Sequence, residues 1–400
     1  MIKSLLDTDF YILTMQQALF HQYTHADVMF QFKWRNWDKM DLRISIDDFI
    51  GRLKDRINAL CELRYTKDEL AFVSDIPFVA SDFVEYLRLF QLNRDYIHIY
   101  KTKENGLGID IHGPAVNTIP FEVPTLATVS QLYTENSRQS KFNWLLEGRK
   151  RLHEKMAYLD ANLHRDMKFG FADFGTRRRA DLDWQREALE TVRDKWPQYL
   201  IGTSNIYFAK KLGLKYIGTM AHFWFQIHQQ LTHRLVDSQK AALQAWANEY
   251  RGELGIALSD TLGFDAFLCD FDRYFALLFD GCRHDSGDPI RWCEKLIDHY
   301  RKLRIDPKTK TAVFSDGLTF QIAVDLFLRF QNHINTSYGI GTYFTNDCGF
   351  IAPQIVIKNV FTNGKPTAKI SDSPGKGMCL DEGFLGYLMR IVEEKVNECR

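Results

Sequence analysis

The sequence predicts an α/β protein in which an irregular, incomplete α/β barrel is combined with an N-terminal α+β domain. The first observation is a pattern that repeats between about residues 165 and 345. Short apolar runs end there in small, polar or charged residues, and most are separated by segments long enough for a helix. The second is that the first third of the chain mixes helical and strand patterns without this alternation. The third is that the tail returns to strand-like sequence.

The opening third and the tail contain the following expected elements. They are a helix over 9–23 with Asp9 as its N-cap, a strand over 28–34, an amphipathic helix over 41–62, two short helices within 67–93, a hairpin of 96–101 and 107–112, a helical region over 125–162, and a tail hairpin of 354–360 and 366–371. Asn-Gly pairs at 105–106 and 363–364 predict the turns of the two hairpins. We expect an N-terminal domain over 1–124 joined by the tail 350–400, and a barrel-like domain over 125–349.

Seven segments share the repeated ending. In order, they are FADFGTRRR (171–179), IGTSN (201–205), IGTMAH (217–222), IALSDT (256–261), GCRHDSGD (281–288), VFSDGL (313–318) and YGIGT (338–342). In a β/α barrel, the loops that follow the strands hold the chemistry at the C-terminal rim of a rigid scaffold. We therefore expect the seven clusters to meet at one rim.

The composition excludes several classes of protein. The 51 Lys and Arg residues balance the 51 Asp and Glu residues, so the chain has no overall field that would attract nucleic acid or an anionic membrane. No apolar stretch approaches the roughly 20 residues that span a bilayer, and the acidic start does not resemble a signal peptide. Seven Cys residues without a C-x-x-C motif indicate a reduced chain. We expect a soluble, cytoplasmic protein.

Two of the clusters offer groups that bind anions and aromatic rings. The three arginines of DFGTRRR could hold phosphate or pyrophosphate bidentately, and Phe174 could stack on a flat substrate. The alternative is a solvated basic loop with a core Phe. In RHDSGD, Arg283 could bind a carboxylate, while Asp285 could accept from ribose hydroxyls or ligate Mg²⁺. A salt-bridged loop is the alternative there.

The other clusters add a nucleophile and backbone donors. His222, after Gly218-Thr219, is a competent nucleophile toward phosphorus, although a lone His at a strand end is more often structural. The run from Gly339 to Thr342 offers open N–H groups to a phosphate, as late barrel strands commonly do. The tail segment SDSPGK (371–376) lacks the first Gly and the final Ser/Thr of a Walker A motif, so we reject that assignment.

Taken together, the motifs resemble those of the nicotinate phosphoribosyltransferases. The segments LLDTDFYILTMQQ (5–17), DFGTRRR, GTSN, GTMAH, RHDSGDP, FSD, GIGT and KISDSPGK (369–376) follow one another in the family's order. The resemblance covers nearly the whole chain. It implies two domains, a homodimer with sites near the interface, and formation of nicotinate mononucleotide and pyrophosphate from nicotinate and 5-phosphoribosyl 1-pyrophosphate, coupled to ATP, with Mg²⁺, in NAD salvage.

The resemblance also implies roles for single residues. His222 takes the place of the histidine that ATP phosphorylates, and Arg283 that of the residue holding the nicotinate carboxylate. Tyr11 and Phe174 correspond to the aromatic residues around the pyridine ring, with Tyr11 within reach of a partner subunit's site. Ser204 stands where amide-using relatives carry an acid, which would repel a carboxylate. The ribose and phosphates would be held by Arg177, Asp285, Gly339, Gly341 and Thr342.

One position departs from the family pattern, and three alternatives remain open. The resemblance predicts Glu after His222, where this chain has Phe223, so Asp316 or Asp285 would have to orient the His. A preference for nicotinamide or quinolinate is one alternative, which Ser204 disfavours for the amide. A catalytically silent binding paralogue is another. An aldolase-like barrel is the third. It would need a Lys at a strand end, and none of the seven endings of this chain contains one.

Overall fold

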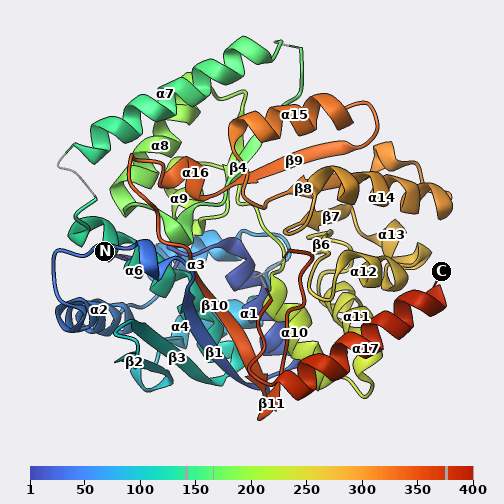
Figure 1. Cartoon of the computed structure of the whole chain (residues 1–400), viewed down its shortest axis with the longest axis horizontal. Helices are drawn as coiled ribbons and strands as arrows, with labels where there is room; N and C mark the ends of the chain where they lie inside the picture. Colours follow the sequence, from blue (N-terminus) through green and yellow to red (C-terminus); the bar gives the residue numbers. More distant parts are fainter. Residues whose placement is uncertain (140–142, 165, 374–376, 400) are drawn as a thin grey trace.

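Two sheets organise the molecule, and they lie side by side in Figure 1. The computed structural model describes residues 1–139, 143–164, 166–373 and 377–399. One sheet has five antiparallel strands in the order β11-β10-β1-β3-β2, and the other has six strands in the order β5-β4-β9-β8-β7-β6. The mixed α/β architecture confirms the fold class predicted from the sequence.

The antiparallel sheet joins the two ends of the chain. Its central strand β1 (Asp27–Trp34) buries alternate side chains, the period-2 pattern of a strand with one covered face. On one side β1 pairs with β3 (Leu107–Pro114), which continues to β2 (Ile97–Lys101). On the other side it pairs with β10 (Ile355–Thr362) of the tail. The tail is therefore built into the N-terminal sheet, whereas the boundaries at 124 and 349 stay predictions.

The tail hairpin is shorter than predicted. Asn363 and Gly364 adopt positive φ at its turn, as an Asn-Gly pair allows. However, β11 comprises only Lys365–Pro366, and the expected strand over 366–371 is wrong beyond that point. The following residues turn into the core, where Lys369 is buried. This turn carries a charged side chain to the cavity described below.

The N-terminal helices differ from their predictions mainly at their starts. They are α1 (Phe10–Gln22), α2 (Ile46–Cys61), α3 (Lys67–Ser74), α4 (Ser81–Leu89) and α5 (Ala115–Thr118). Helix α2 begins after Ser45, whose side chain accepts from the N–H of Asp48, rather than at residue 41. Asp9 is the N-cap residue of α1, as predicted, but its side chain makes no capping hydrogen bond and instead accepts from Ser204. The expected helical region over 125–162 is two helices, α6 (Glu122–Asn136) and α7 (Trp144–Asn162).

Six of the seven repeated endings follow a strand of the parallel sheet. The strands are β4 (Phe171–Asp173), β5 (Leu200–Thr203), β6 (Ile256–Leu258), β7 (Gly281–His284), β8 (Thr311–Phe314) and β9 (Asn335–Ile340). Helices connect or follow them: α8 (Leu182–Lys195), α9 (Ile206–Leu212), α10 (His222–Leu231), α11 (Ser238–Tyr250), α12 (Phe264–Asp270), α13 (Arg273–Leu278), α14 (Pro289–Lys302), α15 (Phe320–Phe330), α16 (Thr342–Thr345) and α17 (Glu382–Cys399). All paired neighbours in this sheet are parallel.

The seventh ending fills the opening of the barrel instead of ending a strand. The ladder is open between β5 and β6 among the described residues, and the segment before His222 lies between them. Ile217 N–H donates to the Thr203 carbonyl of β5 at 2.9 Å. Thr219 Oγ1 donates to the Ile256 carbonyl of β6 at 2.7 Å. The expectation of a strand before His222 is thus wrong, because these residues bridge two strands without forming a ladder.

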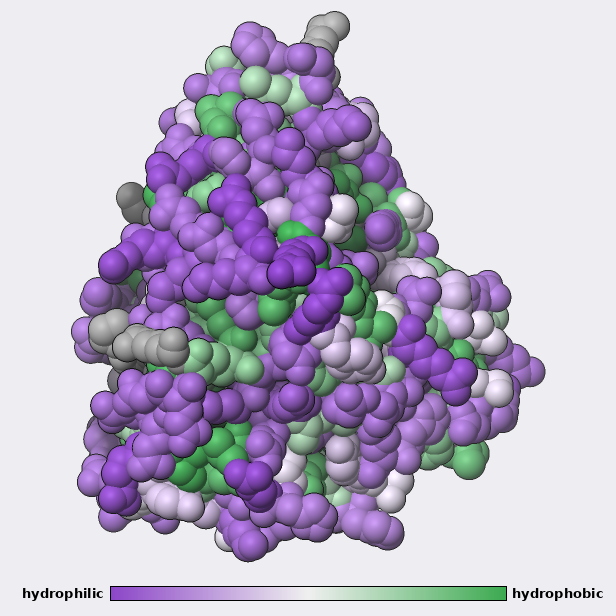
Figure 2. Space-filling model, turned by 90° about the vertical axis from the view of Figure 1, so that its right-hand side faces the viewer, coloured by the Kyte–Doolittle hydropathy of each residue, from purple (hydrophilic) through white to green (hydrophobic). Residues whose placement is uncertain are grey.

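The main hydrophobic core runs from the antiparallel sheet into the barrel, and a second, small cluster joins Leu262, Ala266 and Ala368 to Leu388 of α17. The face shown in Figure 2 is largely hydrophilic, with small hydrophobic patches separated by polar side chains. Within the ranges that the structure describes, no helix combines the length and apolarity needed to cross a membrane.

Candidate active site

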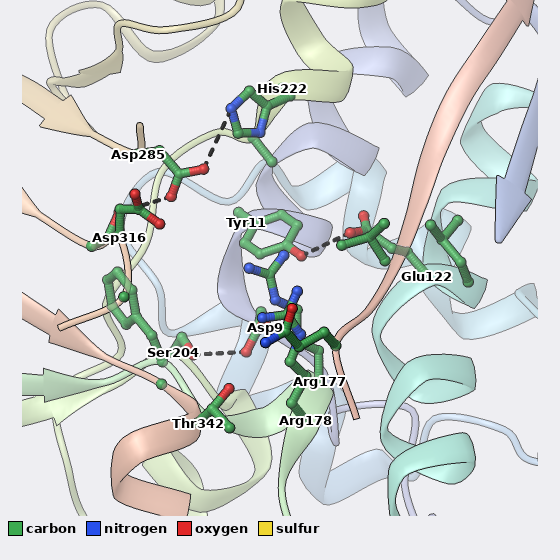
Figure 3. A pocket seen from close by; sticks show the side chains of 18 of the residues that line it. Asp9, Tyr11, Glu122, Arg177, Arg178, Ser204, His222, Asp285, Asp316 and Thr342 are labelled. Atoms are coloured by element: carbon green, nitrogen blue, oxygen red, sulfur yellow. Dashed lines mark hydrogen bonds and ion pairs between the residues drawn. The ribbon is translucent and has the colours of Figure 1, made fainter. Parts of the chain in front are cut away.

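A cavity of about 540 Å³ lies where the rim of the parallel sheet faces α1 and β10. Ten of the residues predicted from the sequence line it: Tyr11, Phe174, Arg177, Ser204, His222, Arg283, Asp285, Asp316, Gly341 and Thr342. Figure 3 shows the labelled side chains among them, from His222 at one end to Ser204 and Thr342 at the other. The clusters therefore meet at one rim, as the strand endings predicted.

Gly339 has a different place from the one expected. It is not among the lining residues; a Cβ there would collide with the ring of Phe174. A Cβ on Gly341 would come within 2.9 Å of the Phe174 carbonyl oxygen. Both glycines thus make room for Phe174, which packs against the end of β9 and contributes to the cavity wall.

One part of the wall is formed by Asp9, Tyr11, Glu122 and Ser204, called here the Tyr11 wall. Ser204 Oγ donates to Asp9 Oδ1 at 2.7 Å, and the Tyr11 hydroxyl donates to Glu122 Oε1 at 3.2 Å. Burial raises the pKa of Asp9 and raises that of Glu122 to about 7. Burial, with the nearby Glu122 carboxylate, keeps the pKa of Tyr11 well above its usual value, so the phenol is neutral. Tyr11 lies in the cavity of its own chain.

Asp9 bears on the prediction that Ser204, by replacing an acid, favours a carboxylate substrate. A carboxylate reaches this part of the cavity from the start of α1 even though residue 204 is not an acid. Burial raises the pKa of Asp9, whereas the positive charges of Arg177 and Arg179 lower it. The role of Ser204 in selecting a carboxylate substrate stays a prediction.

Behind the Tyr11 wall lies a fully buried polar network. Arg179 donates through both terminal nitrogens to Asp7, with distances of 2.7 Å to each oxygen. Asn205 donates to the same carboxylate at 2.8 Å. Nearby, Asp173 accepts from Thr203 Oγ1 at 2.7 Å. The prediction that three arginines of DFGTRRR bind phosphate is therefore wrong for Arg179, which holds the loop to the N-terminal segment.

The remaining arginines face the cavity. Arg177 and Arg178 line it, together with Arg35 from the N-terminal domain. Burial and the charge of Arg177 lower the pKa of Arg178 to about 9, so it still carries its charge near neutral pH. Nε of Arg283 is buried, and among the described residues it has no hydrogen-bond partner. An unsatisfied buried guanidinium nitrogen is suited to a carboxylate or phosphate oxygen.

At the other end, His222, Asp260, Asp285 and Lys369 form a charged group called here the His222 cluster. His222 Nε2 lies 2.8 Å from Asp260 Oδ1 and 3.5 Å from Asp285 Oδ2. Lys369 Nζ lies 2.6 Å from the same nitrogen and 2.8 Å from Asp260 Oδ2. Burial and the Lys369 ammonium lower the pKa of His222 to about 4, against the opposing effect of Asp260. The imidazole is therefore neutral near pH 7.

The two contacts of His222 Nε2 belong to different tautomers. With its proton on Nε2, the ring donates to Asp260; with the proton on Nδ1, Nε2 accepts from Lys369. Asp260 is thus the closest carboxylate to the ring, and Asp285 is second. Asp316 lies beyond Asp285 in Figure 3. Phe223, at the position where Glu was expected, is buried and packs against Phe30 with ring centroids 4.9 Å apart.

The loop after β9 is held from behind by α7. Thr342 lines the cavity and begins the short helix α16. Lys155 donates to the Tyr343 carbonyl at 2.5 Å and contacts Asp347 at 2.8 Å. A buried ammonium thus fixes the turn that the sequence predicts for a phosphate.

Several cavity residues escaped the sequence reasoning. Asp9, Arg35, Glu122, Lys358 and Lys369 line the cavity, and Asp260 contacts His222 and Lys369, which line it. Asp260 stood in the segment IALSDT, whose polar ending was the available signal. Glu122 lies just before the predicted helical region over 125–162, and Lys369 lies within the predicted strand over 366–371. Nothing in the spacing distinguishes either residue from a surface charge. Of SDSPGK, residues 374–376 lie outside the described part of the chain.

Comparison with known proteins agrees with this geometry over nearly the whole chain. Residues 169–394 match the model of the nicotinate phosphoribosyltransferase family, and residues 6–130 match the model of its N-terminal domain. A nicotinate phosphoribosyltransferase from Chromobacterium violaceum is 49% identical over 396 residues, which cover 98% of this chain and 96% of the relative. Nicotinate phosphoribosyltransferase 1 from Pseudomonas aeruginosa is 47% identical, with coverage of 98% and 96%.

The chain belongs to the nicotinate phosphoribosyltransferase family.

Solved structures of this family share the fold. The crystal structure of nicotinate phosphoribosyltransferase from Vibrio cholerae superposes with a TM-score of 0.91 at 35% identity, covering 99% of this chain and 96% of that one. A putative nicotinate phosphoribosyltransferase from Saccharomyces cerevisiae superposes with a TM-score of 0.86 at 29% identity, covering 99% and 98%. Membership of the family makes this chain a phosphoribosyltransferase and confirms the resemblance drawn from the motifs.

Proposed function

We propose that the chain joins nicotinate to 5-phosphoribosyl 1-pyrophosphate, releasing pyrophosphate, and that ATP drives the reaction through a phosphohistidine at His222. The observation that carries this proposal is the pairing, in one cavity, of a neutral imidazole with cationic side chains that face it. His222 is a nucleophile whose pKa of about 4 leaves its lone pair free at neutral pH. Arg283 offers a buried nitrogen that has no partner among the described side chains.

In the transfer step, the pyridine nitrogen of nicotinate forms a bond to C1 of the ribose. The bond from C1 to the pyrophosphate oxygen breaks, and pyrophosphate leaves with the electron pair. Positive charge develops on the ribose, so the protein contributes position and electrostatic stabilisation. In this proposal Arg283 holds the carboxylate, Tyr11 and Phe174 flank the ring, and Asp285 faces the ribose. Arg177 and the turn at Gly341-Thr342 bind phosphate oxygens.

In the ATP step, a ring nitrogen of His222 attacks the γ-phosphorus, and the bond to the ADP oxygen breaks. Asp260 and Lys369 orient the ring, because each contacts Nε2, and the tautomer depends on which of the two bonds to that nitrogen. Water later cleaves the phosphohistidine, which returns the free imidazole and releases phosphate. The energy of this cycle favours a closed site and product formation.

Mg²⁺ fits the same end of the cavity. His222, Asp260 and Asp285 offer ligand atoms within 4.8 Å of one another, and carboxylate oxygens are the donors that Mg²⁺ prefers. Lys369 lies 2.8 Å from Asp260 and 3.9 Å from Asp285, and the side chain of Asp260 is 2% exposed against 24% for Asp285. Asp285 is therefore the carboxylate that would hold the ion beside the pyrophosphate oxygens. The ion would neutralise charge on the leaving pyrophosphate.

The cellular setting forms part of the proposal. The product would enter NAD synthesis by salvage. All seven cysteines lie in the described part of the chain and none is paired, which suits the reducing cytoplasm. We also propose a homodimer, which light scattering on the purified protein would test.

The test is the formation of nicotinate mononucleotide from nicotinate, 5-phosphoribosyl 1-pyrophosphate and Mg²⁺, with and without ATP. Turnover that rises with ATP and releases ADP supports both steps. In His222→Ala, the ATP effect should disappear while slow ATP-independent transfer remains; stimulation that persists would remove His222 from the mechanism. Product from nicotinamide or quinolinate alone would move the assignment to those substrates, and binding without turnover would indicate a silent paralogue.

A further inference from the structure

We infer that Glu122 is a positioning residue, which holds the Tyr11 phenol ring in the cavity wall by accepting the hydrogen bond of its hydroxyl. The inference rests on the proposed function, in which Tyr11 flanks the pyridine ring of nicotinate. Glu122 takes no part in either bond-making step. It acts on the ring pocket through Tyr11.

The contact joins the first turns of two helices that are both largely buried. Tyr11 sits in the first turn of α1, and its ring is attached by two rotatable bonds, with the hydroxyl at the cavity. Glu122 is the first residue of α6, a helix whose residues are nearly all buried. The 3.2 Å hydrogen bond therefore ties the hydroxyl end of the Tyr11 ring to a side chain of a second helix, whose position packing already holds.

The surroundings favour an acceptor at this place. Figure 3 shows the hydroxyl of Tyr11 directed at Glu122, with Arg177 below the ring. The Glu122 side chain is buried, at 8% exposure, and the phenol is the hydrogen-bond donor that the structure records for it. Burying a carboxylate is costly unless it is hydrogen-bonded or paired, so a buried acid that lines a cavity and accepts from one wall residue indicates a positional role. Burial raises the pKa of Glu122 to about 7, and both protonation states keep an oxygen that can accept from Tyr11.

Three variants distinguish an effect of the Tyr11–Glu122 hydrogen bond on nicotinate binding from an effect of the negative charge of Glu122. Glu122→Ala and Tyr11→Phe each remove one partner, and each should raise the KM for nicotinate roughly tenfold. The KM for 5-phosphoribosyl 1-pyrophosphate should stay unchanged. Glu122→Gln keeps an acceptor oxygen without the charge and should restore most of the nicotinate KM. Because the partners act as one unit, the double variant Tyr11→Phe/Glu122→Ala should be no worse than either single variant.

Glu69→Ala is the matched control for the loss of a buried carboxylate. Glu69 has the same 8% exposure and accepts from Ser4 and Thr66 in the N-terminal domain, but it does not line the cavity. The Glu69→Ala substitution should lower the melting temperature without changing the KM for nicotinate. Melting temperatures of all variants, measured alongside the kinetics, separate misfolding from misplacement of the ring.

Failure of this inference differs from failure of the proposed function. If the wild-type chain makes no nicotinate mononucleotide, the proposed function is wrong and the KM comparison cannot begin. If the wild type is active and Glu122→Ala keeps its KM for nicotinate, the positioning role is wrong. A Glu122→Gln variant as impaired as Glu122→Ala would also overturn it, because the charge rather than the hydrogen bond would then matter. So would effects that add fully in the double variant.

Discussion

The Tyr11 wall rests on a buried hydrogen-bond network, whereas in the His222 cluster a neutral imidazole contacts two carboxylates and an ammonium directly. Behind the wall, Asp7 and Arg179 have exposures of 1% and 0% and form a bidentate pair. In the cluster, His222 Nε2 lies within 2.8 Å of both an acid and an amine, and its contacts depend on where the proton is. One end of the cavity is thus held by buried pairs, and at the other end the hydrogen bonding depends on the position of one proton.

This difference predicts which substitutions should lower stability and which should lower activity. A change in the network removes a partner that cannot be replaced by water, so it should cost stability. A change in the cluster alters protonation or orientation at a group already facing the cavity, so it should cost chemistry first. The following predictions test this division, from the largest expected effect to the smallest.

Arg179→Met should remove the buried ion pair with Asp7 behind the Tyr11 wall. It leaves the Asp7 carboxylate buried with Asn205 as its remaining donor. We expect the free energy of unfolding to fall by about 3–5 kcal/mol, as for other buried pairs that lose one partner. Urea denaturation measures it. Arg149→Met, at an exposed pair with Glu187, is the control and should cost less than about 1 kcal/mol. Equal losses in the two variants would contradict the division.

Arg283→Ala asks which end of the cavity receives the carboxylate. The substitution removes the guanidinium whose Nε is buried without a partner in the described structure. The KM for nicotinate should rise by an amount equivalent to about 2–4 kcal/mol, with the unfolding free energy nearly unchanged. Steady-state kinetics with nicotinate as the varied substrate provide the measurement. An unchanged KM would place the carboxylate elsewhere.

Lys369→Met tests whether the His222 cluster sets the protonation of its histidine. Burial and the ammonium of Lys369 together hold the pKa of His222 at about 4. Without that ammonium the pKa should rise toward its ordinary value of 6.5, so ATP hydrolysis should begin to fall at a higher pH on acidification. The pH profile of ADP release, compared with that of the wild type, reports the shift. A profile whose acid limb does not move would assign the low pKa to burial alone.

His228→Gln separates a structural histidine from His222, the histidine on the same helix that is proposed to react with ATP. His228 is buried away from the cavity between the Trp224 carbonyl and the Tyr23 hydroxyl, and burial lowers its pKa to about 4. The unfolded chain binds protons below pH 6.5 that the folded state refuses, so stability is lost as the pH falls from about 6.5 toward 4.

The expected size follows from the same linkage. By about pH 5.5 this single group should cost roughly 1.2 kcal/mol relative to neutral pH. His228→Gln should reduce that acid-induced loss while ATP stimulation persists. Melting temperatures at neutral and acidic pH give the answer, and an identical pH dependence in both proteins would exclude His228 as a contributor.

The sequence predicted the residues that line the cavity better than it predicted the buried residues behind them. Polar endings such as those at Asp285 and Thr342 are local signals, because a strand must stop where its buried side chains stop. Parallel strands then carry these ends to one rim, which is why ten predicted residues line one cavity. The same local signal failed for Arg179. Its sequence neighbours Arg177 and Arg178 face the cavity, while Arg179 is buried with an aspartate 172 positions earlier.

By itself, the sequence determined the fold class, the order of the motifs and the family, since these depend on periodicity and on residue types that lie close together in the chain. Only the tertiary structure decided that Asp260 and Lys369, 109 positions apart, meet at His222. It also decided that Glu122 faces Tyr11, 111 positions away. The physical reason is that the charge of an acid or a lysine is visible in a sequence, whereas its burial and its partner are set by how distant elements pack.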